Sequence, residues 1–62
     1  MSTRRLPEIS LQLQEARRRD PDAYRTIAAA ARIPVARVKA IAYGQAEPTD
    51  QERRVLAIEA RG

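Results

Sequence analysis

The chain has 62 residues, which is enough for one small domain and too few for a second. It contains no cysteine and no histidine, which excludes disulfide bonds, thiolate or imidazole catalysis and the usual zinc sites. Twelve Lys and Arg residues oppose eight Asp and Glu residues, and the net charge of +4 favours polyanionic partners, nucleic acid first among them.

The first half of the chain predicts a basic arm followed by two helices. Residues 1–6 are polar and basic without apolar periodicity, so we expect a flexible arm there. A helix over 7–19 follows from the proline at its start and from apolar residues that recur at i, i+4 and i+7: Ile9, Leu13 and Ala16. Arg17, Arg18 and Arg19 suit its C-terminal end.

A second helix is expected over 21–31, with Asp20 as its N-cap and Pro21 at its first position. One face of this helix carries the side chains suited to the core: Tyr24, Ile27, Ala28 and Ala31. Pro34 prevents its continuation, because proline lacks the amide that an interior turn requires.

Two further helices complete the predicted fold. One covers 35–43, with Gly44 as its C′ residue. The last covers 50–60, introduced by a capping box of Thr49 and Glu52. The sequence therefore predicts an all-α, compact four-helix domain over residues 7–62 with a central helix-turn-helix.

The stretch from Tyr24 to Tyr43 resembles the DNA-binding core of the phage repressor and Cro family, also called the xenobiotic-response-element-like family. The resemblance covers roughly residues 9–60. It is carried by the aliphatic–alanine pair of the second helix, the small residues of the turn, the two anchors of the third helix and the Gly and Pro that follow: Ile27, Ala28, Ala31, Ile33, Val38, Ile41, Gly44 and Pro48. Such a resemblance implies a small sequence-specific regulator of transcription, expected to be a repressor of phage or mobile-element type, that binds double-stranded DNA.

The resemblance also implies which residues meet DNA. The third helix would enter the major groove and contact bases through Val35, Ala36, Arg37 and Ala40. Phosphate contacts would come from Tyr24, Arg25, Arg32, Lys39 and Tyr43. Between Arg25 and Ala46 there are four cations and no acid, as approach to phosphate requires.

Three residues depart from the family pattern. Arg32 stands where the family commonly has a turn glycine, and Pro34 replaces the usual Ser or Thr N-cap. The third departure is that Val35, Ala36 and Ala40 cannot form bidentate hydrogen bonds with bases, although they can touch thymine methyl groups. Direct readout would then fall mainly on Arg37, with Lys39 and Tyr43 as helpers. The sequence alone also allows Arg37 to be a phosphate-bound or solvated cation.

Other assignments stay open at this stage. Arg4 and Arg5 are either a minor-groove arm or a disordered tail. Leu11 and Ile58 fall outside the main apolar stripes and are either ordinary exposed residues or the contact of a weak homodimer.

No enzyme, cofactor, catalytic or metal site is expected, since the chain offers no Gly-rich phosphate loop and no carboxylate pair at a suitable spacing. Its longest apolar run, Ile27 to Ala31, is far short of the roughly 20 residues of a membrane span, and no signal peptide is visible, so we expect a cytoplasmic protein. The rival hypothesis is a helix-turn-helix fold reused to bind or inhibit a host protein, favoured by the apolar outer side of the third helix.

Overall fold

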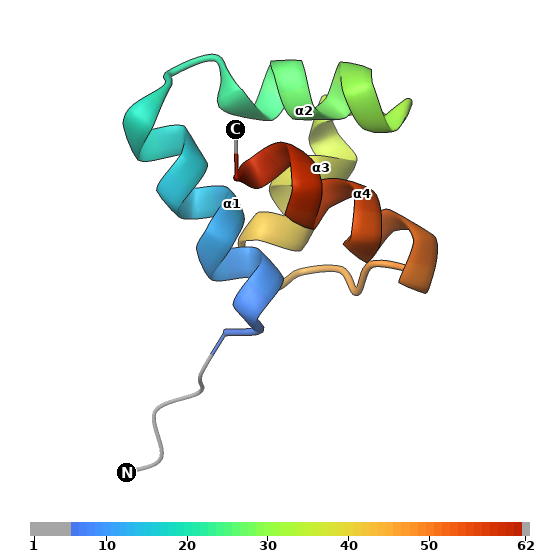
Figure 1. The fold of residues 1–62 in the computed structure, drawn as a ribbon. Helices are drawn as coiled ribbons and strands as arrows, with labels where there is room; N and C mark the ends of the chain where they lie inside the picture. Colours follow the sequence, from blue (N-terminus) through green and yellow to red (C-terminus); the bar gives the residue numbers. More distant parts are fainter. Residues whose placement is uncertain (1–5, 62) are drawn as a thin grey trace, which may run out of the picture.

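The computed structural model describes residues 6–61 and contains four helices within them (Figure 1). These are α1 (Glu8–Arg19), α2 (Ala23–Ala31), α3 (Val35–Ala42) and α4 (Asp50–Ala60). The described part of the chain has no strand. The predicted all-α four-helix fold is therefore confirmed, while the arm predicted over 1–6 lies outside the described residues apart from Leu6.

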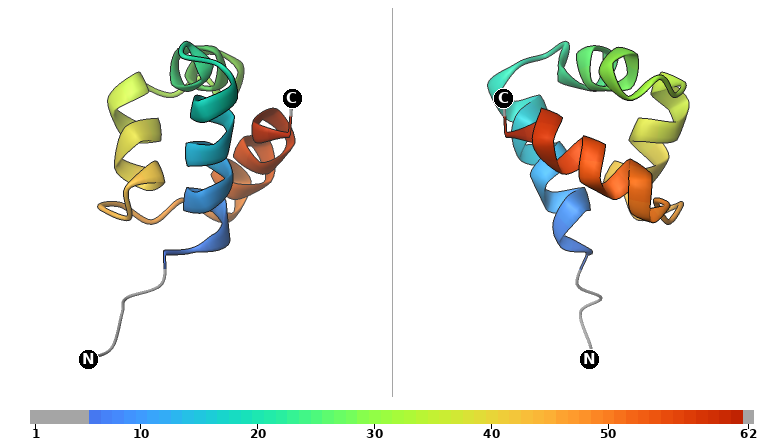
Figure 2. Two further views of the ribbon diagram at one scale, coloured as in Figure 1. Left: turned by 90° about the vertical axis from the view of Figure 1, so that its left-hand side faces the viewer. Right: turned by 45° about the vertical axis from the view of Figure 1, so that its right-hand side comes forward.

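Helices α1 and α2 each pack against the other three helices, whereas α3 and α4 do not pack directly on one another. In Figure 2 (left), α3 and α4 lie on either side of α1, and α2 crosses the end of all of them. No Cα atom of α3 comes within 8 Å of a Cα atom of α4. The position of α3 relative to α4 thus depends on α1, on α2 and on side chains that reach across.

The core is built from one apolar stripe on each helix. Its members are Ile9, Leu13, Ala16, Ala23, Tyr24, Ile27, Ala28, Val38, Ile41, Ala42, Leu56 and Ala60. Five of these are alanines, which let helix backbones approach closely because they add little volume to the interface. Ala28 is only 2% exposed, so a larger side chain there has no room without moving a neighbouring helix.

Helix starts follow local capping chemistry. At α4, the Thr49 hydroxyl accepts a hydrogen bond from the Glu52 amide, and the Glu52 carboxylate accepts one from the Thr49 amide, which is the predicted capping box. Helix α2 begins at Ala23, two residues later than the expected start at Pro21. The delay arises because Asp20 accepts bonds from the amides of Asp22 and Ala23 and so closes a separate turn first.

The turn between α2 and α3 depends on Arg32, which adopts a left-handed conformation with φ 59° and ψ 42°. The amide of Ile33 donates to the carbonyl of Ala28, and the amide of Arg32 donates to that of Ala29. This pair of bonds is a Schellman motif, which normally has glycine in the left-handed position. The turn therefore has a left-handed residue at its centre, with an arginine in a conformation that disfavours any side chain.

Helix α3 also ends in a Schellman motif, here with the usual glycine in the left-handed position. Gly44 has φ 75°, its amide donates to the carbonyl of Ile41, and the Gln45 amide donates to that of Ala40. A Cβ atom at Gly44 would lie 2.8 Å from Leu6 Cδ2, the movable end of a side chain, so the position favours glycine chiefly for its backbone angle.

Polar side chains of α1 bind carbonyl groups at the ends of other helices. The buried Ser10 hydroxyl donates to the carbonyl of Ile41 (2.6 Å), and the Gln14 amide donates to that of Ala42 (2.7 Å). The Arg19 guanidinium donates to the carbonyl of Ala60 (2.7 Å). Because the last carbonyls of a helix have no partner within it, these three bonds fix where α3 and α4 end against α1.

Replacing Arg32 with Gly is expected to raise the free energy of unfolding by roughly 0.5–1 kcal/mol, because glycine adopts the left-handed conformation without strain. Thermal unfolding followed by circular dichroism should show a Tm higher by about 2–8 °C. The matched control is Ala30→Gly at an exposed position in the last turn of α2, which should lower the stability by up to about 1 kcal/mol. A lower Tm for Arg32→Gly would show that the guanidinium supplies more than the backbone strain costs.

Candidate nucleic-acid interface

Helix α3 has one buried side and one outward side. Val38, Ile41 and Ala42 are buried on the core. The outward stripe, spaced i, i+4 and i+7, consists of Ala36, Ala40 and Tyr43, of which Ala40 is half-buried and the other two are exposed. The stripe is flanked by Val35 and Lys39 on one side and by Arg37 on the other. The four predicted base contacts therefore all lie on or beside the outward part of α3.

Beside this stripe, α1, α2 and α3 together form a small cationic cleft. It has a volume of about 150 Å³ and is lined by Arg17, Pro21, Asp22, Tyr24, Arg25, Val35 and Lys39. One cation thus comes from each of three helices, against the single acid Asp22. The structure brings together three of the predicted phosphate contacts, Tyr24, Arg25 and Lys39, and adds Arg17, which the sequence placed only at a helix end.

Tyr24 and Tyr43 pack edge to face, with ring centroids 6.2 Å apart and an angle of 89° between the planes. Tyr24 is 5% exposed, as predicted for a core ring, and Tyr43 is 54% exposed. Burial, followed by the neighbouring Tyr43 hydroxyl, raises the pKa of Tyr24 to about 12. The Tyr24 hydroxyl therefore stays uncharged at neutral pH and brings no negative charge to the cationic cleft.

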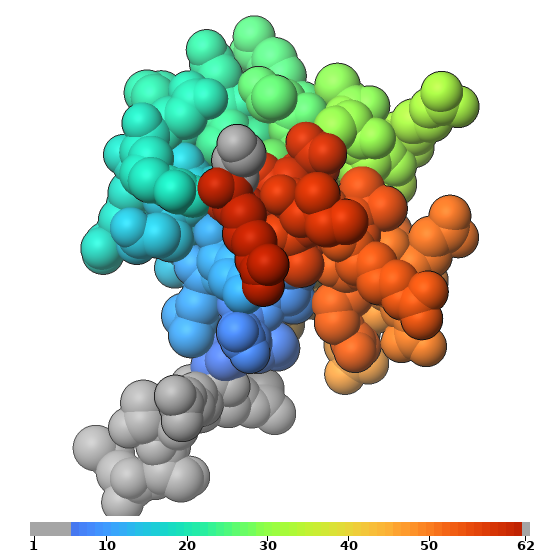
Figure 3. Space-filling model, viewed as in Figure 1, coloured from blue at the N-terminus to red at the C-terminus, as the bar shows by residue number. Residues whose placement is uncertain are grey.

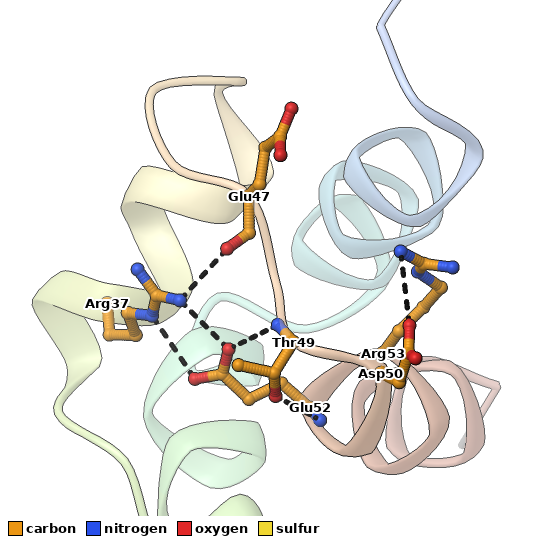
Figure 4. A network of polar contacts seen from close by, with 6 residues as sticks. All are labelled: Arg37, Glu47, Thr49, Asp50, Glu52 and Arg53. Carbon is orange, nitrogen blue, oxygen red and sulfur yellow. Dashed lines mark hydrogen bonds and ion pairs between the residues drawn. The ribbon is translucent and has the colours of Figure 1, made fainter.

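Arg37 is held by an ion pair across the gap between α3 and α4 (Figure 4). Its Nε and Nη2 atoms donate to the two carboxylate oxygens of Glu52 at 3.1 and 2.9 Å, and Nη2 also donates to the carbonyl of Glu47 at 2.9 Å. Glu52 at the same time caps α4 through the amide of Thr49. We call these four residues, Arg37, Glu47, Thr49 and Glu52, the α3–α4 clamp.

The clamp changes the role expected of Arg37. A bidentate contact with guanine needs two guanidinium nitrogens in one plane, and here two are already bound to Glu52. The structure therefore favours a positioning role for Arg37, which holds α3, and disfavours a role in reading a base. The sequence contained the signal for Glu52 as a cap, but nothing in it paired Glu52 with Arg37, fifteen residues away.

The remaining predicted residues lie apart from the cleft. Arg32 is exposed at the turn before α3. Leu11 and Ile58, the candidate dimer contacts, are 46% and 68% exposed on α1 and α4. Arg4 and Arg5, the predicted minor-groove arm, lie outside the described residues.

Four exposed cations lie near the outward side of α3 without an ion pair in the described part of the chain. Within residues 6–61, ion pairs join Arg18 to Glu15, Arg37 to Glu52 and Arg53 to Asp50. None of these pairs involves Arg17, Arg25, Arg32 or Lys39, and the same is true of Arg19, Arg54 and Arg61. Exposed cations of one sign without acidic partners raise the local potential, and phosphate is the group that such a surface attracts.

A second groove lies between α1, α2 and the C-terminal part of α4, on the face seen in Figure 3. It has a volume of about 440 Å³ and is mainly apolar, with Ala16, Ala23, Ile27 and Ala60 in its lining. The carboxylates of residues 6–61 form no cluster suited to a metal ion. In the same part of the chain, no helix combines the length and the apolar character that crossing a membrane demands.

Comparison of the chain with protein-family models, curated proteins and solved structures found no match. A function is therefore argued from the geometry of the outward stripe, the cationic cleft and the α3–α4 clamp.

The clamp should make stability depend on acid pH. The hydrogen bond from Arg37, followed by the one from the Thr49 amide, lowers the pKa of Glu52 from 4.5 to about 2. A carboxylate with a lowered folded-state pKa stabilises the fold above its unfolded pKa and loses that contribution as the pH falls, here between about 4.5 and 2.

Glu52→Gln is expected to cost about 1–2 kcal/mol at pH 7, because it removes the charge-assisted bonds with Arg37, while the glutamine oxygen can still accept from the Thr49 amide. Its Tm should also fall less than that of the wild type when the pH is lowered from 5 to 2.5. The matched control is Glu15→Gln, an exposed carboxylate on α1. Equal acid sensitivity of the wild type and Glu52→Gln would show that the clamp does not hold in solution.

Proposed function

We propose that the protein is a small sequence-specific regulator of transcription that binds double-stranded DNA through a helix-turn-helix formed by α2 and α3. One observation carries the proposal: within α3 the outward stripe has only small side chains, and the exposed cations beside it form no ion pair within residues 6–61. A helix face with small side chains and positive flanks suits the major groove, which admits one helix between two phosphate backbones.

In this proposal the groups of the cationic cleft hold the phosphate backbone. Arg17, Arg25 and Lys39 project from three helices, so a single phosphate strand can meet all three. The amides at the start of α2 and the neutral Tyr24 hydroxyl add hydrogen-bond donors beside them. Arg32, at the turn, would bind a further phosphate.

Arg37 has a positioning role in the proposed complex. Its pair with Glu52 sets the position of α3 against α4, and so sets how far the outward stripe enters the groove. Repression by occupying a promoter, in the cytoplasm of the host cell, is the simplest output of such a complex. The predicted contacts of Arg4 and Arg5 with the minor groove stay predictions.

The proposal predicts that Arg17→Ala, Arg25→Ala and Lys39→Ala each weaken binding to all duplexes alike. Each variant should reduce the slope of log affinity against log salt by about 1, because one counterion fewer is released. Fluorescence anisotropy with a labelled random-sequence duplex over a range of salt concentrations measures both quantities. Arg54→Ala, an exposed cation on α4, is the control and should leave the slope unchanged. A salt slope that changes in Arg54→Ala but not in the three cleft variants would contradict the cationic cleft as the phosphate-binding surface.

Assembly follows from the small footprint of α3. Eight residues of helix cover only a few base pairs, so two copies on half-sites about 34–36 Å apart would be needed for a specific site. The exposed Ile58 is our first choice for the contact and Leu11 the second. Sedimentation should show a monomer or weak dimer without DNA, with two copies on a two-site duplex and loss of the cooperativity in Ile58→Glu. Tight dimers that survive Ile58→Glu would refute this contact.

The alternative function is a protein-binding module, for example an inhibitor of a host protein. The apolar outward stripe of α3 and the apolar groove between α2 and α4 are the observations that favour it. Retention on heparin separates the two hypotheses, because a DNA-binding surface elutes late in a salt gradient. Early elution together with no binding to duplex DNA would favour the protein-binding module.

A further inference from the structure

We infer, on the basis of the proposed function, that α3 recognises thymine in the major groove by its C5-methyl group and not by hydrogen bonds to base edges. The preferred DNA would then carry thymines, on either strand, under the outward stripe. The inference depends on which groups α3 presents outward and on which of its polar groups are already bound elsewhere.

The outward stripe presents two methyl groups at its centre. Ala36 and Ala40 are one turn apart and each ends in a single Cβ atom, with neither donor nor acceptor. Val35, half-buried at the edge of the stripe, adds branched aliphatic carbon. A base edge that lies against this surface can offer it only one apolar group, and in the major groove that group is the methyl of thymine.

The hydrogen-bonding side chains of α3 are directed to other partners. Arg37 donates to Glu52 and to the Glu47 carbonyl. Lys39 lines the cationic cleft with Arg17 and Arg25, which is where a phosphate oxygen would be bound. Neither residue is left to read a base edge with the two-point geometry that separates guanine from adenine.

Tyr43 ends the stripe just after α3 and carries its one hydroxyl group. Its ring and the Tyr24 ring pack edge to face, so the orientation of Tyr43 is set within the protein. Within α3 itself, the stripe consists of the short apolar side chains of Ala36 and Ala40. Hydrophobic contact with a methyl group is the discrimination that such a surface can supply.

The test compares duplexes that differ only in that methyl group. Uracil pairs with adenine as thymine does and shows the same hydrogen-bonding edge, but it lacks the C5-methyl. Duplexes are first selected from a random pool with the full chain, and single thymines in the enriched sequence are then replaced by uracil. We expect about a fourfold loss of affinity for each contacted methyl, the value of one buried CH₂ group.

Two variants connect the loss to α3. Ala40→Gly and Ala36→Gly remove the contacting Cβ, so in each the thymine-to-uracil ratio of affinities should fall toward one. Ala30→Gly is the matched control, because it makes the same change on an exposed turn of α2, on the side that faces away from Arg25. Should Ala40→Gly fail to fold, Ala36→Gly near the start of α3 still tests the inference at a lower cost in helix stability.

The outcomes separate this inference from the proposed function. Sequence-preferring, salt-dependent binding that is indifferent to uracil overturns methyl recognition and leaves DNA binding intact. An enriched sequence without thymine under α3, with guanine in its place and sensitivity to Arg37→Ala, also overturns it. No salt-dependent binding to any duplex overturns the proposed function, and the inference with it.

Discussion

The bond between Arg37 and Glu52 is the interaction on which the arrangement of this small domain most depends. No Cα atom of α3 lies within 8 Å of a Cα atom of α4, and among residues 6–61 every polar contact between these two helices comes from this pair. Glu52 also caps α4, so one carboxylate both starts a helix and holds its neighbour. The same bond removes the guanidinium from the outward side of α3, which leaves a surface of alanine and tyrosine.

The opposite end of α3 is fixed by α1. Ser10 and Gln14, one turn apart on α1, bind the last carbonyls of α3, and Arg19 binds the end of α4. The chain has no Phe or Trp, and its core has five alanines. The burial of apolar area alone therefore gives only a small free energy of unfolding. Charge-assisted and buried hydrogen bonds at helix ends add specificity to that core, because the last carbonyls of a helix have no partner within the helix itself.

The stability of the fold does not account for the position of the cations beside the outward stripe of α3. Arg17, Arg25 and Lys39 converge on one cleft from three helices and have no acidic partner except the nearby Asp22. Like charges gathered in this way repel one another and destabilise the compact state. Arg18, Arg37 and Arg53 are paired with carboxylates, whereas these three cations, like Arg19, Arg54 and Arg61, have no ion pair within residues 6–61. The convergence of Arg17, Arg25 and Lys39 on one cleft supports a polyanionic partner for this side of the molecule.

The sequence by itself determined the features that depend on near neighbours along the chain. The four helices, the capping box of Thr49 and Glu52 and the turns at Arg32 and Gly44 follow from side chains within a few residues of each feature. The start of α2 was misplaced by two residues, because Asp20 closes a turn that helix-capping rules alone do not distinguish from the helix itself.

Only the tertiary structure decided the partners of the long polar side chains. Arg37 meets Glu52 over fifteen residues, Gln14 meets Ala42 over 28 and Ser10 meets Ile41 over 31, and Arg17 joins the cationic cleft from another helix. An arginine or glutamine can reach in several directions from its Cα atom, so periodicity gives its face but not its partner. Which direction it takes depends on the helix that packs beside it, and that packing is fixed by the whole core at once.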